Sequence, residues 1–529
     1  MIPLASPTLF LYGPPATGKS TCARNLAVAL AKTAIDLDTL IEQRLGMTIP
    51  QAVEQFGQQY FRDTETEVLR TLCKQSPNAV VALGGGALLR DENRALAEKC
   101  GPIVCIHTPA EVLAKRVEKK AGSRPFSKNA DGLLKLLQER QAHYDSFELN
   151  LRLSGKQMPQ EVWPKVMALL GRYLVSGMAS PYPVVIAPDA IDELPRLLER
   201  LDPKPAHLLL VGDSNTLPLY ADRVKQAVGG DIPQFQIPAG EENKTLATVN
   251  RIWEAMGAAH LERNDLVIAL GGGVTGDLTG FAASAWLRGI RWLNLPTTLL
   301  AMVDAGIGGK TGADLPSGKN LIGAFHPPCA VLSATKTLQT LPEREIRCGL
   351  SETLKHAVIG DSELLAMLAE FAEKRNDIDW LTRLVIRSAG VKVRTILEDP
   401  FERTGKRAAL NLGHTIGHAV EAASNFTIAH GEAVAIGTVA ATRIAAKMQI
   451  AQTTLISQLQ TALQTLGLPT EIPSTLAADQ LHDYLLRDKK KAAGKVRFAL
   501  PVEVGTVRTG IIVPEEILND ILTRKGIES

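Results

Sequence analysis

A glycine-rich loop near the N-terminus restricts the possible folds most strongly. Residues 13–20 read GPPATGKS, which fits the pattern GxxxxGK[ST], and they lie between an apolar run at 9–12 and a helical run. When such a loop connects a strand to a helix, its backbone N–H groups can bind phosphate oxygens. The pattern therefore predicts a nucleotide-binding domain with a parallel sheet, in which Lys19 neutralises the β- and γ-phosphates and Ser20 binds Mg²⁺.

The rest of the chain divides into regions with different apolar patterns. Its 529 residues are too many for one hydrophobic core. Apolar runs alternate with helical periods over residues 1–172, and a segment rich in small residues and proline over 173–183 predicts a linker. A second α/β pattern covers 184–334, and a mostly helical pattern covers 335–529. We therefore expect an α/β protein in which a P-loop domain precedes an α/β domain and a mostly α-helical domain.

Charge and composition exclude several classes of partner. The net charge is +2, so we expect no broad attraction to nucleic acid or to an anionic membrane. No apolar run reaches about 18 residues, and the N-terminus lacks the charged region of a signal peptide. Six cysteines are scattered without a CxxC pair, which favours reduced thiols and a cytoplasmic location.

Polar residues beyond the P-loop indicate a pocket for a small polyhydroxylated anion. Carboxylates suit ring hydroxyls, arginines bind a carboxylate as planar forks, and glycines at the end of a strand leave room for a ligand. The residues of this pocket are Asp36, Asp38, Arg62, Gly84, Gly85, Gly86, Arg124 and Arg140.

Together with the P-loop, this set resembles shikimate kinase over roughly residues 5–170. The resemblance implies that ATP contacts Gly13, Gly18, Lys19, Ser20, Thr21, Arg116 and Arg124. It implies that shikimate contacts Asp38, Arg62, Gly84, Gly85, Gly86 and Arg140, and that Mg²⁺ contacts Ser20 and Asp36. The catalytic residues would be Lys19, Asp38 and Arg124. The loop lacks the methionine–glycine pair that is usual in this family, and the lid reads RPFS instead of RPLL.

A second glycine-rich turn indicates a dinucleotide site. Gly271–Asp277 reads GGGVTGD and follows the apolar run at 265–270. Glycines at this position let the backbone approach a pyrophosphate closely. Asp213 ends an earlier apolar run, where a carboxylate suits ribose hydroxyls. Further polar turns carry Glu241, Lys244, Lys310, Lys319 and Asn320, which suit phosphate and carboxylate groups.

The segment 410–432 contains His414, His418 and His430. His414 and His418 are four residues apart, so they share one face of a helix, and imidazole is the commonest metal ligand. This spacing favours a Zn²⁺-type site that contains both histidines and is completed by a carboxylate from elsewhere. Glu352, in the helical segment CGLSETLKHAV, is the expected carboxylate ligand.

Four motifs in this half resemble 3-dehydroquinate synthase over about residues 181–525. They are GGGVxGDxxGF at 271–281, GGKTGxxxxxGKNxIGxF at 308–325, LNxGHTxGHAxE at 410–421 and HGEAVAxG at 430–437. The resemblance implies that Glu352, His414 and His430 bind the metal, Zn²⁺ or Co²⁺. His418 would then be an acid/base or phosphate contact instead of a ligand. This set replaces the pair that spacing alone favours.

The same resemblance implies roles for other residues. NAD would contact Asp213, Glu241, Lys244, Gly272, Gly273, Asp277, Thr297, Thr298, Lys310 and Lys319. The substrate would contact Asn320, Arg407, Asn411 and either Lys489 or Lys490. The catalytic residues would be Asp304, Lys310, Lys355, His418 and Arg288. Arg288 would reach the phosphate of a neighbouring subunit's substrate, which implies a homodimer.

The two resemblances together predict a bifunctional enzyme of aromatic amino acid biosynthesis. One half would phosphorylate shikimate with ATP. The other would convert 3-deoxy-D-arabino-heptulosonate 7-phosphate to 3-dehydroquinate and phosphate. The alternatives are a sister sugar-phosphate cyclase, a polyol dehydrogenase that releases NADH, and an N-terminal nucleotide-binding regulatory module. The intact GKNLIGAFH argues against the first alternative, and Lys19, Asp38, Arg62 and Arg140 argue against the last.

Overall fold

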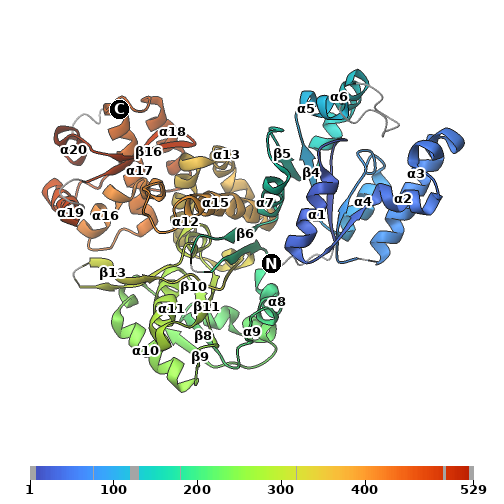
Figure 1. Ribbon diagram of the computed structural model, residues 1–529. Coiled ribbons are helices and arrows are strands. Elements are labelled where there is room, and N and C mark those ends of the chain that lie inside the picture. The colour runs from blue at the N-terminus through green and yellow to red at the C-terminus, as the bar shows by residue number, and fades with distance from the viewer. Residues whose placement is uncertain are drawn as a thin grey trace. The chain divides into compact units, whose positions relative to one another are not determined.

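The computed structural model describes residues 8–75, 77–118, 130–178, 180–316, 318–491 and 496–523. The chain divides into two compact units, residues 1–170 and 171–529. Each unit has its own sheet and its own hydrophobic core (Figure 1). Among the described residues, no helix combines the length and the apolar character needed to cross a bilayer.

The N-terminal unit is built on a parallel sheet with the strand order β2-β3-β1-β4-β5. The strands are β1 (Thr8–Tyr12), β2 (Thr33–Asp36), β3 (Ala79–Ala82), β4 (Ile103–His107) and β5 (Leu149–Arg152). The helices are α1 (Lys19–Leu30), α2 (Leu37–Leu45), α3 (Ile49–Gln75), α4 (Asp91–Cys100), α5 (Ala110–Glu118), α6 (Ala130–Asp145) and α7 (Pro159–Leu169). Phe10 and Tyr12 pack into one core and Leu9 and Leu11 into another, because successive strand residues point to opposite faces.

The parallel register brings the functional loops of this unit to one edge of the sheet. Leu11 in β1 and Asp36 in β2 both lie beside Ala82 in β3. The carboxyl ends of the three strands therefore meet, and ligands of open parallel sheets bind at this edge. The loop after β1, Asp36 at the end of β2 and Gly84 after β3 all lie there.

The C-terminal unit begins with a seven-stranded sheet whose order is β6-β7-β14-β11-β10-β8-β9. Its strands are β6 (Arg172–Val175), β7 (Tyr182–Ala187), β8 (Leu208–Asp213), β9 (Gln234–Ile237), β10 (Leu266–Gly271), β11 (Arg291–Pro296) and β14 (Ala330–Ala334). The helices beside this sheet are η1 (Ala190–Glu193), α8 (Leu194–Glu199), α9 (Leu217–Val228), η2 (Glu241–Asn243), α10 (Leu246–Ala258), α11 (Gly273–Ala285) and η3 (Trp286–Arg288).

The segment 173–183, for which the sequence predicts a linker, contributes two strands to this sheet. β6 pairs antiparallel with β7, and Arg172 lies opposite Val185. Pro183, one of the prolines that suggest a linker, lies within β7 itself. The two units therefore divide after Leu170, ahead of the predicted linker.

A mostly helical part follows the sheet. It contains α12 (Glu343–Gly360), α13 (Glu363–Ala369), α14 (Phe371–Lys374), α15 (Ile378–Glu398), α16 (His414–Ala423), α17 (His430–Lys447), α18 (Thr454–Thr465), α19 (Ala478–Lys491) and α20 (Glu515–Leu522). Shorter elements are the π-helical turn η4 (Ala301–Ala305), η5 (Thr335–Thr340) and η6 (Arg407–Asn411). Two antiparallel pairs are β12 (Lys310–Leu315) with β13 (Gly318–Phe325), and β15 (Phe498–Glu503) with β16 (Thr506–Ile511).

One core joins the helical part to one end of the sheet. Ile186 in β7 and Val331 in β14 pack in the same cluster as residues of α12, α15 and α17. Figure 1 shows the β12–β13 pair extending from the sheet toward the region of α16. The turn η4, which follows β11, contacts α12, the helix that carries the predicted metal ligand Glu352.

Candidate active sites

The P-loop of the N-terminal unit has the conformation that phosphate binding requires. Gly13 has φ +123°, and a Cβ there would meet the carbonyl oxygen of Ile106, so only glycine fits. The Lys19 ammonium donates to the carbonyl oxygens of Gly13 and Pro14, at 2.8 Å each. The loop therefore holds a cation against its own carbonyl groups, where a phosphate can replace them. Ser20 and Thr21 lie in the first turn of α1.

Arg116 of α5 connects the P-loop to a second loop. Its guanidinium donates to the carbonyl oxygens of Ala16 and Gly155, at 3.2 Å each. This position beside the P-loop fits the expected contact with ATP. Arg124 lies outside the described residues, so its expected role on the lid stays a prediction.

The predicted acceptor pocket comes together around the glycines after β3. A Cβ at Gly86 would lie 2.6 Å from Nη2 of Arg62 and 3.2 Å from Nη1 of Arg140. A Cβ at Gly84 would lie 2.8 Å from Oδ1 of Asp38. These glycines therefore leave space in which a carboxylate can reach both arginines while a hydroxyl reaches Asp38.

Three further residues shape this pocket and were missing from the predicted site. Glu65, one turn after Arg62, is buried and forms an ion pair with it at 2.5 Å. Burial raises the pKa of Glu65, although Arg62 acts in the opposite direction. The hydroxyls of Tyr12 and Tyr144 donate to the carbonyl oxygen of Gly85, at 3.3 and 2.7 Å. The i, i+3 spacing of Arg62 and Glu65 is a signal that could have found Glu65.

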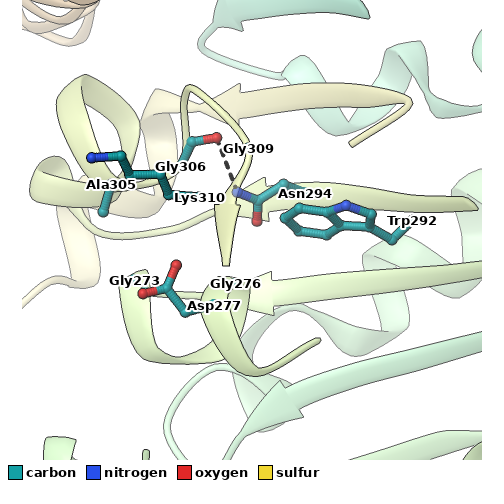
Figure 2. Close-up of a pocket in the computed structure, with 10 residues that line it drawn as sticks. Gly273, Gly276, Asp277, Trp292, Asn294, Ala305, Gly306, Gly309 and Lys310 are labelled. Atoms are coloured by element: carbon teal, nitrogen blue, oxygen red, sulfur yellow. Dashed lines mark hydrogen bonds between the residues drawn. The ribbon is translucent and has the colours of Figure 1, made fainter. Parts of the chain in front are cut away.

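In the C-terminal unit, the turn after β10 opens into a small cavity. Figure 2 shows residues around it that come from α11, β11 and the start of β12, among them Asp277, Asn294 and Lys310. Its full lining is Gly272, Gly273, Gly276, Asp277, Trp292, Asn294, Ala305, Gly306, Gly309 and Lys310. Gly273 begins α11, so the N-terminal end of that helix faces the cavity. This is the arrangement expected for binding a pyrophosphate.

Charged residues predicted to contact NAD surround this turn. Lys244 forms an ion pair with Asp277 at 2.6 Å and donates to Asn320 at 2.7 Å. Lys319 forms an ion pair with Glu241 at 3.1 Å. Asn320, expected at the substrate, therefore contacts a nucleotide-site lysine.

The strand ends beside the turn carry the remaining predicted NAD contacts. Asp213, at the end of β8, accepts a hydrogen bond from the Thr275 hydroxyl at 3.1 Å. Thr298 lies against Gly272, since a Cβ on that glycine would be 3.0 Å from its methyl group. Thr297 follows β11, and its buried hydroxyl has no hydrogen-bond partner among the described residues.

Glu352, His414 and His430 converge on one point from three different helices. One ligand atom of each lies within 4.8 Å of the others. Oε1 of Glu352 is 3.5 Å from Nε2 of His414 and 3.4 Å from Nε2 of His430. Glu352 is fully buried, and apart from these two imidazoles its carboxylate contacts the ammonium of Lys355. A buried carboxylate that faces two imidazoles in this way is the donor set of a divalent metal.

Hydrogen bonds orient the two imidazoles toward this point. Nδ1 of His414 donates to the carbonyl oxygen of Leu412 at 3.1 Å. Nδ1 of His430 donates to Oε2 of Glu421 at 3.4 Å. In each case the proton on Nδ1 leaves the Nε2 lone pair free to bind a metal.

His418, which spacing alone favours as a ligand, lies beside this trio. Its ring centroid is 5.2 Å from that of His414 and 6.0 Å from that of His430. His418, Glu421 and His430 also have ligand atoms within 4.8 Å of one another, but Glu421 already pairs with Lys319 at 2.6 Å. Oε1 of Glu352 faces the Nε2 atoms of both His414 and His430, so the trio with His414 fits the metal better.

A cluster of buried charges adjoins the metal trio. Lys355 contacts both Glu352 and Asp304, with its ammonium 3.6 Å from Oδ2 of Asp304. Lys392 of α15 lies 2.5 Å from Oδ1 of Asp304, and His356 lies 3.7 Å from the same oxygen. Although burial acts in the opposite direction, Lys355 and Lys392 hold the pKa of Asp304 well below its usual value.

The sequence analysis missed Lys392. It lies between Val391 and Val393, which are both buried in the core. A lysine inside such an apolar helical run is itself a signal, because an ammonium is rarely buried without a partner. Burial lowers the pKa of Lys392, although Asp304 acts against this effect.

Lys310 and Arg407 meet at Glu402, which was also missed. Glu402 pairs with Lys310 at 2.6 Å and with Arg407 at 3.4 Å. Arg407 is fully buried and donates to the carbonyl oxygen of Pro400 at 2.7 Å. Lys310 and Arg407 therefore lie close together, because both form ion pairs with the carboxylate of Glu402. Asn411 ends η6, the turn that begins at Arg407.

Arg288, Lys489 and Lys490 are the predicted residues that remain to be placed. Arg288 lies in η3, where it and Leu287 both have left-handed backbone angles, φ +67° and +50°. Lys489 and Lys490 belong to α19, but their side chains are outside the described part of the structure.

Sequence comparisons agree with both halves of this structure. The family described as "Shikimate kinase" matches residues 15–170. Those described as "3-dehydroquinate synthase N-terminal" and "3-dehydroquinate synthase C-terminal" match residues 234–348 and 349–491. The 3-dehydroquinate synthase of Synechocystis sp. is 45% identical over 352 residues, which are 65% of this chain and 97% of that protein. The synthase of Symbiobacterium thermophilum is 41% identical, over 66% of this chain and 97% of that protein.

Solved structures that resemble the C-terminal unit are sister cyclases. A 2-epi-5-epi-valiolone synthase from Streptomyces hygroscopicus, with NAD⁺ and Zn²⁺ bound, is 28% identical, with a TM-score of 0.60. The match covers 66% of this chain and 98% of that chain. A 2-deoxy-scyllo-inosose synthase complexed with carbaglucose-6-phosphate, NAD⁺ and Co²⁺ is 25% identical, with a TM-score of 0.59. That match covers 67% of this chain and 99% of that chain.

The identities to the 3-dehydroquinate synthases, 41–45%, exceed those to the sister cyclases, 25–28%. The shikimate kinase match falls in the N-terminal unit, which contains the five-stranded sheet. The synthase match falls in the C-terminal unit, which contains the seven-stranded sheet. The C-terminal unit of this chain therefore belongs to the 3-dehydroquinate synthase family and the N-terminal unit to the shikimate kinase family, so that one polypeptide joins the two enzymes.

Proposed function

We propose that the C-terminal unit converts 3-deoxy-D-arabino-heptulosonate 7-phosphate to 3-dehydroquinate and phosphate, using NAD⁺ and a divalent metal. The observation that supports this proposal is the meeting of three features within one unit. They are the metal trio, the glycine turn after β10 and the cations Lys310, Lys355 and Arg407. A phosphorylated keto acid needs all three, because it presents hydroxyls to oxidise and two anionic groups to bind.

The residues fit both cofactors. Glu352, His414 and His430 would hold Zn²⁺ or Co²⁺, and the turn at Gly272 and Gly273 would hold the pyrophosphate of NAD⁺. When bound, the metal polarises a ring hydroxyl and the dinucleotide takes up a hydride and returns it within one turnover.

The protein's own groups bind and orient the substrate. Lys355 and Lys392 face Asp304, so this carboxylate stays ionised and can accept a hydrogen bond from a hydroxyl beside the metal trio. Lys310 and Arg407 bind an anionic group of the substrate once it replaces Glu402. His418, beside the trio, is positioned to move a proton or to contact the phosphate.

For the N-terminal unit we propose phosphorylation of shikimate by ATP with Mg²⁺. Lys19 and Arg116 bind the nucleotide, while Arg62 and Arg140 bind the shikimate carboxylate. Asp38 orients the attacking hydroxyl, and Ser20 and Asp36 place Mg²⁺. Arg124 on the lid stays part of this proposal.

We also propose a homodimer through the C-terminal unit and a cytoplasmic location. The left-handed turn at Leu287 and Arg288 supports the first proposal, because it presents a half-exposed leucine beside an arginine. The six cysteines are free thiols, which supports the second. Within the C-terminal unit, the division into an NAD-binding part and a metal-binding part falls near residues 334–335.

A phosphate-release assay tests the synthase proposal. The purified chain is given the heptulosonate phosphate with and without NAD⁺ and a chelator. We expect release that requires both cofactor and metal, with no net accumulation of NADH. Accumulating NADH would indicate a polyol dehydrogenase, and no release would direct the search to the substrates of the sister cyclases. ADP formation that depends on shikimate tests the kinase proposal in the same preparation.

A further inference from the structure

A series of polar contacts runs from Glu241 in η2 to the metal trio. Glu241 contacts Lys319 at 3.1 Å, and Lys319 contacts Oε1 of Glu421 at 2.6 Å. The other oxygen of Glu421 accepts from Nδ1 of His430 at 3.4 Å, and Nε2 of His430 faces Glu352 at 3.4 Å. The series therefore connects a residue predicted to bind NAD with a residue predicted to bind the metal.

Glu421 can orient His430 only because Lys319 compensates its charge. Glu421 is 4% exposed, and a carboxylate at that depth requires a cation or several hydrogen bonds. Lys319 supplies the cation, and the ring of Phe426 covers it, with the ammonium 4.7 Å from the ring centroid. The strength of the bond from His430 to Glu421 therefore depends on how tightly Lys319 holds Glu421.

Binding of the dinucleotide would change how tightly Lys319 holds Glu421. Its diphosphate and ribose groups would compete for the ammonium of Lys319 and the carboxylate of Glu241. If Lys319 turned toward the nucleotide, Glu421 would become a stronger acceptor for the Nδ1 proton of His430. A stronger bond at Nδ1 raises the electron density at Nε2, which makes the imidazole a better metal ligand.

We propose that Lys319 and Glu421 are positioning residues that couple the two cofactor sites, so that NAD⁺ and the metal each strengthen the binding of the other. This inference rests on the proposed binding of both cofactors. Thermodynamic linkage requires the effect to be reciprocal. Metal on His430 strengthens its bond to Glu421, which releases Lys319 toward the nucleotide.

A nearby lysine provides a matched control. Lys244 is also predicted to bind NAD, but its partners are Asp277 and Asn320, within the nucleotide site. Lys244→Gln should therefore weaken NAD⁺ binding without changing the coupling. Lys319→Gln should weaken NAD⁺ binding and abolish the coupling. Lys319→Arg keeps the cation and should retain the coupling.

The experiment measures two affinities without any substrate. Zn²⁺ is titrated into the metal-free full chain against a chromophoric chelator, with and without saturating NAD⁺. NAD⁺ binding is measured by calorimetry with and without Zn²⁺. We expect NAD⁺ to tighten Zn²⁺ binding about tenfold in the natural chain and Zn²⁺ to tighten NAD⁺ binding by the same factor. In Lys319→Gln and Glu421→Gln the factor should fall to about one.

Glu421→Gln should in addition weaken Zn²⁺ binding alone by about ten- to a hundredfold, because the imidazole loses its charged acceptor. A factor of one in the natural chain would overturn the proposal, and so would a full factor in Lys319→Gln. Failure of either cofactor to bind the natural chain would overturn the proposed function itself. Thermal unfolding of each variant identifies any that fail to fold, and Lys319→Gln changes a side chain that is 26% exposed and not essential to the core.

Discussion

The two active sites hold their charges in opposite ways. In the N-terminal unit, Lys19 and Arg116 donate to backbone carbonyl oxygens of the loops around them. In the C-terminal unit, Lys355 pairs with both Glu352 and Asp304, and all three side chains are largely buried. The first arrangement leaves cations whose partners a phosphate can replace. The second is a group of buried side chains of opposite charge that contact one another before any ligand arrives.

The difference follows from what each site must bind. A kinase takes two anionic ligands and releases both, so its cations need partners of modest strength. A site that holds a metal and a dinucleotide through several chemical steps gains from fixed, water-excluded charges. Burial makes each of those charges costly when its partner is lost. The two units should therefore respond differently to the same kind of substitution.

The largest expected effect separates the two activities completely. His430→Ala should lose the metal and reduce phosphate release from the heptulosonate phosphate by about a thousandfold, since a metal contributes several kcal/mol to charge stabilisation. Kinase activity should be unchanged. Metal content and both activities are measured on one preparation. Full retention of stoichiometric metal in this variant would contradict the ligand assignment.

The reciprocal variant is Lys19→Ala. Removing the cation that faces the transferred phosphate should reduce kinase activity by about a hundred- to a thousandfold, while phosphate release by the other site is unchanged. Parallel loss of both activities in either variant would show that the two sites depend on each other, against the independent cores that the structure shows.

A smaller effect tests the contrast in charge burial. Lys392→Met leaves Asp304 with one fewer cation in a nearly dry environment, and should destabilise the C-terminal unit by about 3–5 kcal/mol. Arg116→Met in the N-terminal unit removes a cation from carbonyl oxygens and should cost no more than about 1.5 kcal/mol. Urea unfolding, followed by probes specific to each unit, measures both. Equal losses would remove the distinction between the sites.

The smallest expected effect is a difference in acid response. Burial raises the pKa of Glu65, so the folded N-terminal unit takes up a proton at a higher pH than the unfolded chain does. The stability of the N-terminal unit should therefore rise as the pH falls through the raised pKa of Glu65. Glu65→Gln should remove this rise.

Asp399 in the C-terminal unit should respond in the opposite direction. Although burial acts against it, hydrogen bonds from the backbone N–H groups of Thr404 and Arg403 lower the pKa of Asp399 to about 2. Its stabilising effect should be complete above about pH 4 and lost as the pH falls toward 2. Thermal unfolding between pH 7 and 3 measures both units. A pH response that Asp399→Asn leaves unaltered would exclude this carboxylate as the cause.

Local patterns predicted the parts of each site that lie close together in sequence. The P-loop and the turn at Gly271–Asp277 each join a strand to a helix, as their glycines indicate. The pairing of Glu352 with His414 and His430 depends on how three helices pack, so the spacing of His414 and His418 favoured a different pair. The family resemblance supplied the trio that the geometry brings together.

The sequence analysis missed residues whose role is to neutralise or orient other side chains of the site. Lys392 neutralises Asp304 from another helix, and Glu421 orients His430 across a helix pair. Lys392 belongs to none of the motifs, and Glu421 ends the motif at 410–421 but pairs with Lys319 and His430. Their roles exist only once distant segments meet, and no period or spacing along the chain encodes that meeting.

The strand β6 has a practical consequence for anyone who wishes to separate the two enzymes. A cut at residue 183, where composition suggests a linker, would remove the partner strand of β7 and leave its edge open to association with other chains. It would also remove the ion pair between Arg172 and the buried carboxylate of Glu193, and the hydrogen bond from the Tyr173 hydroxyl to the carbonyl oxygen of Ile386. A synthase expressed alone should start at Gly171, and a gene fission that yields two working proteins has only the few codons around 170 available to it.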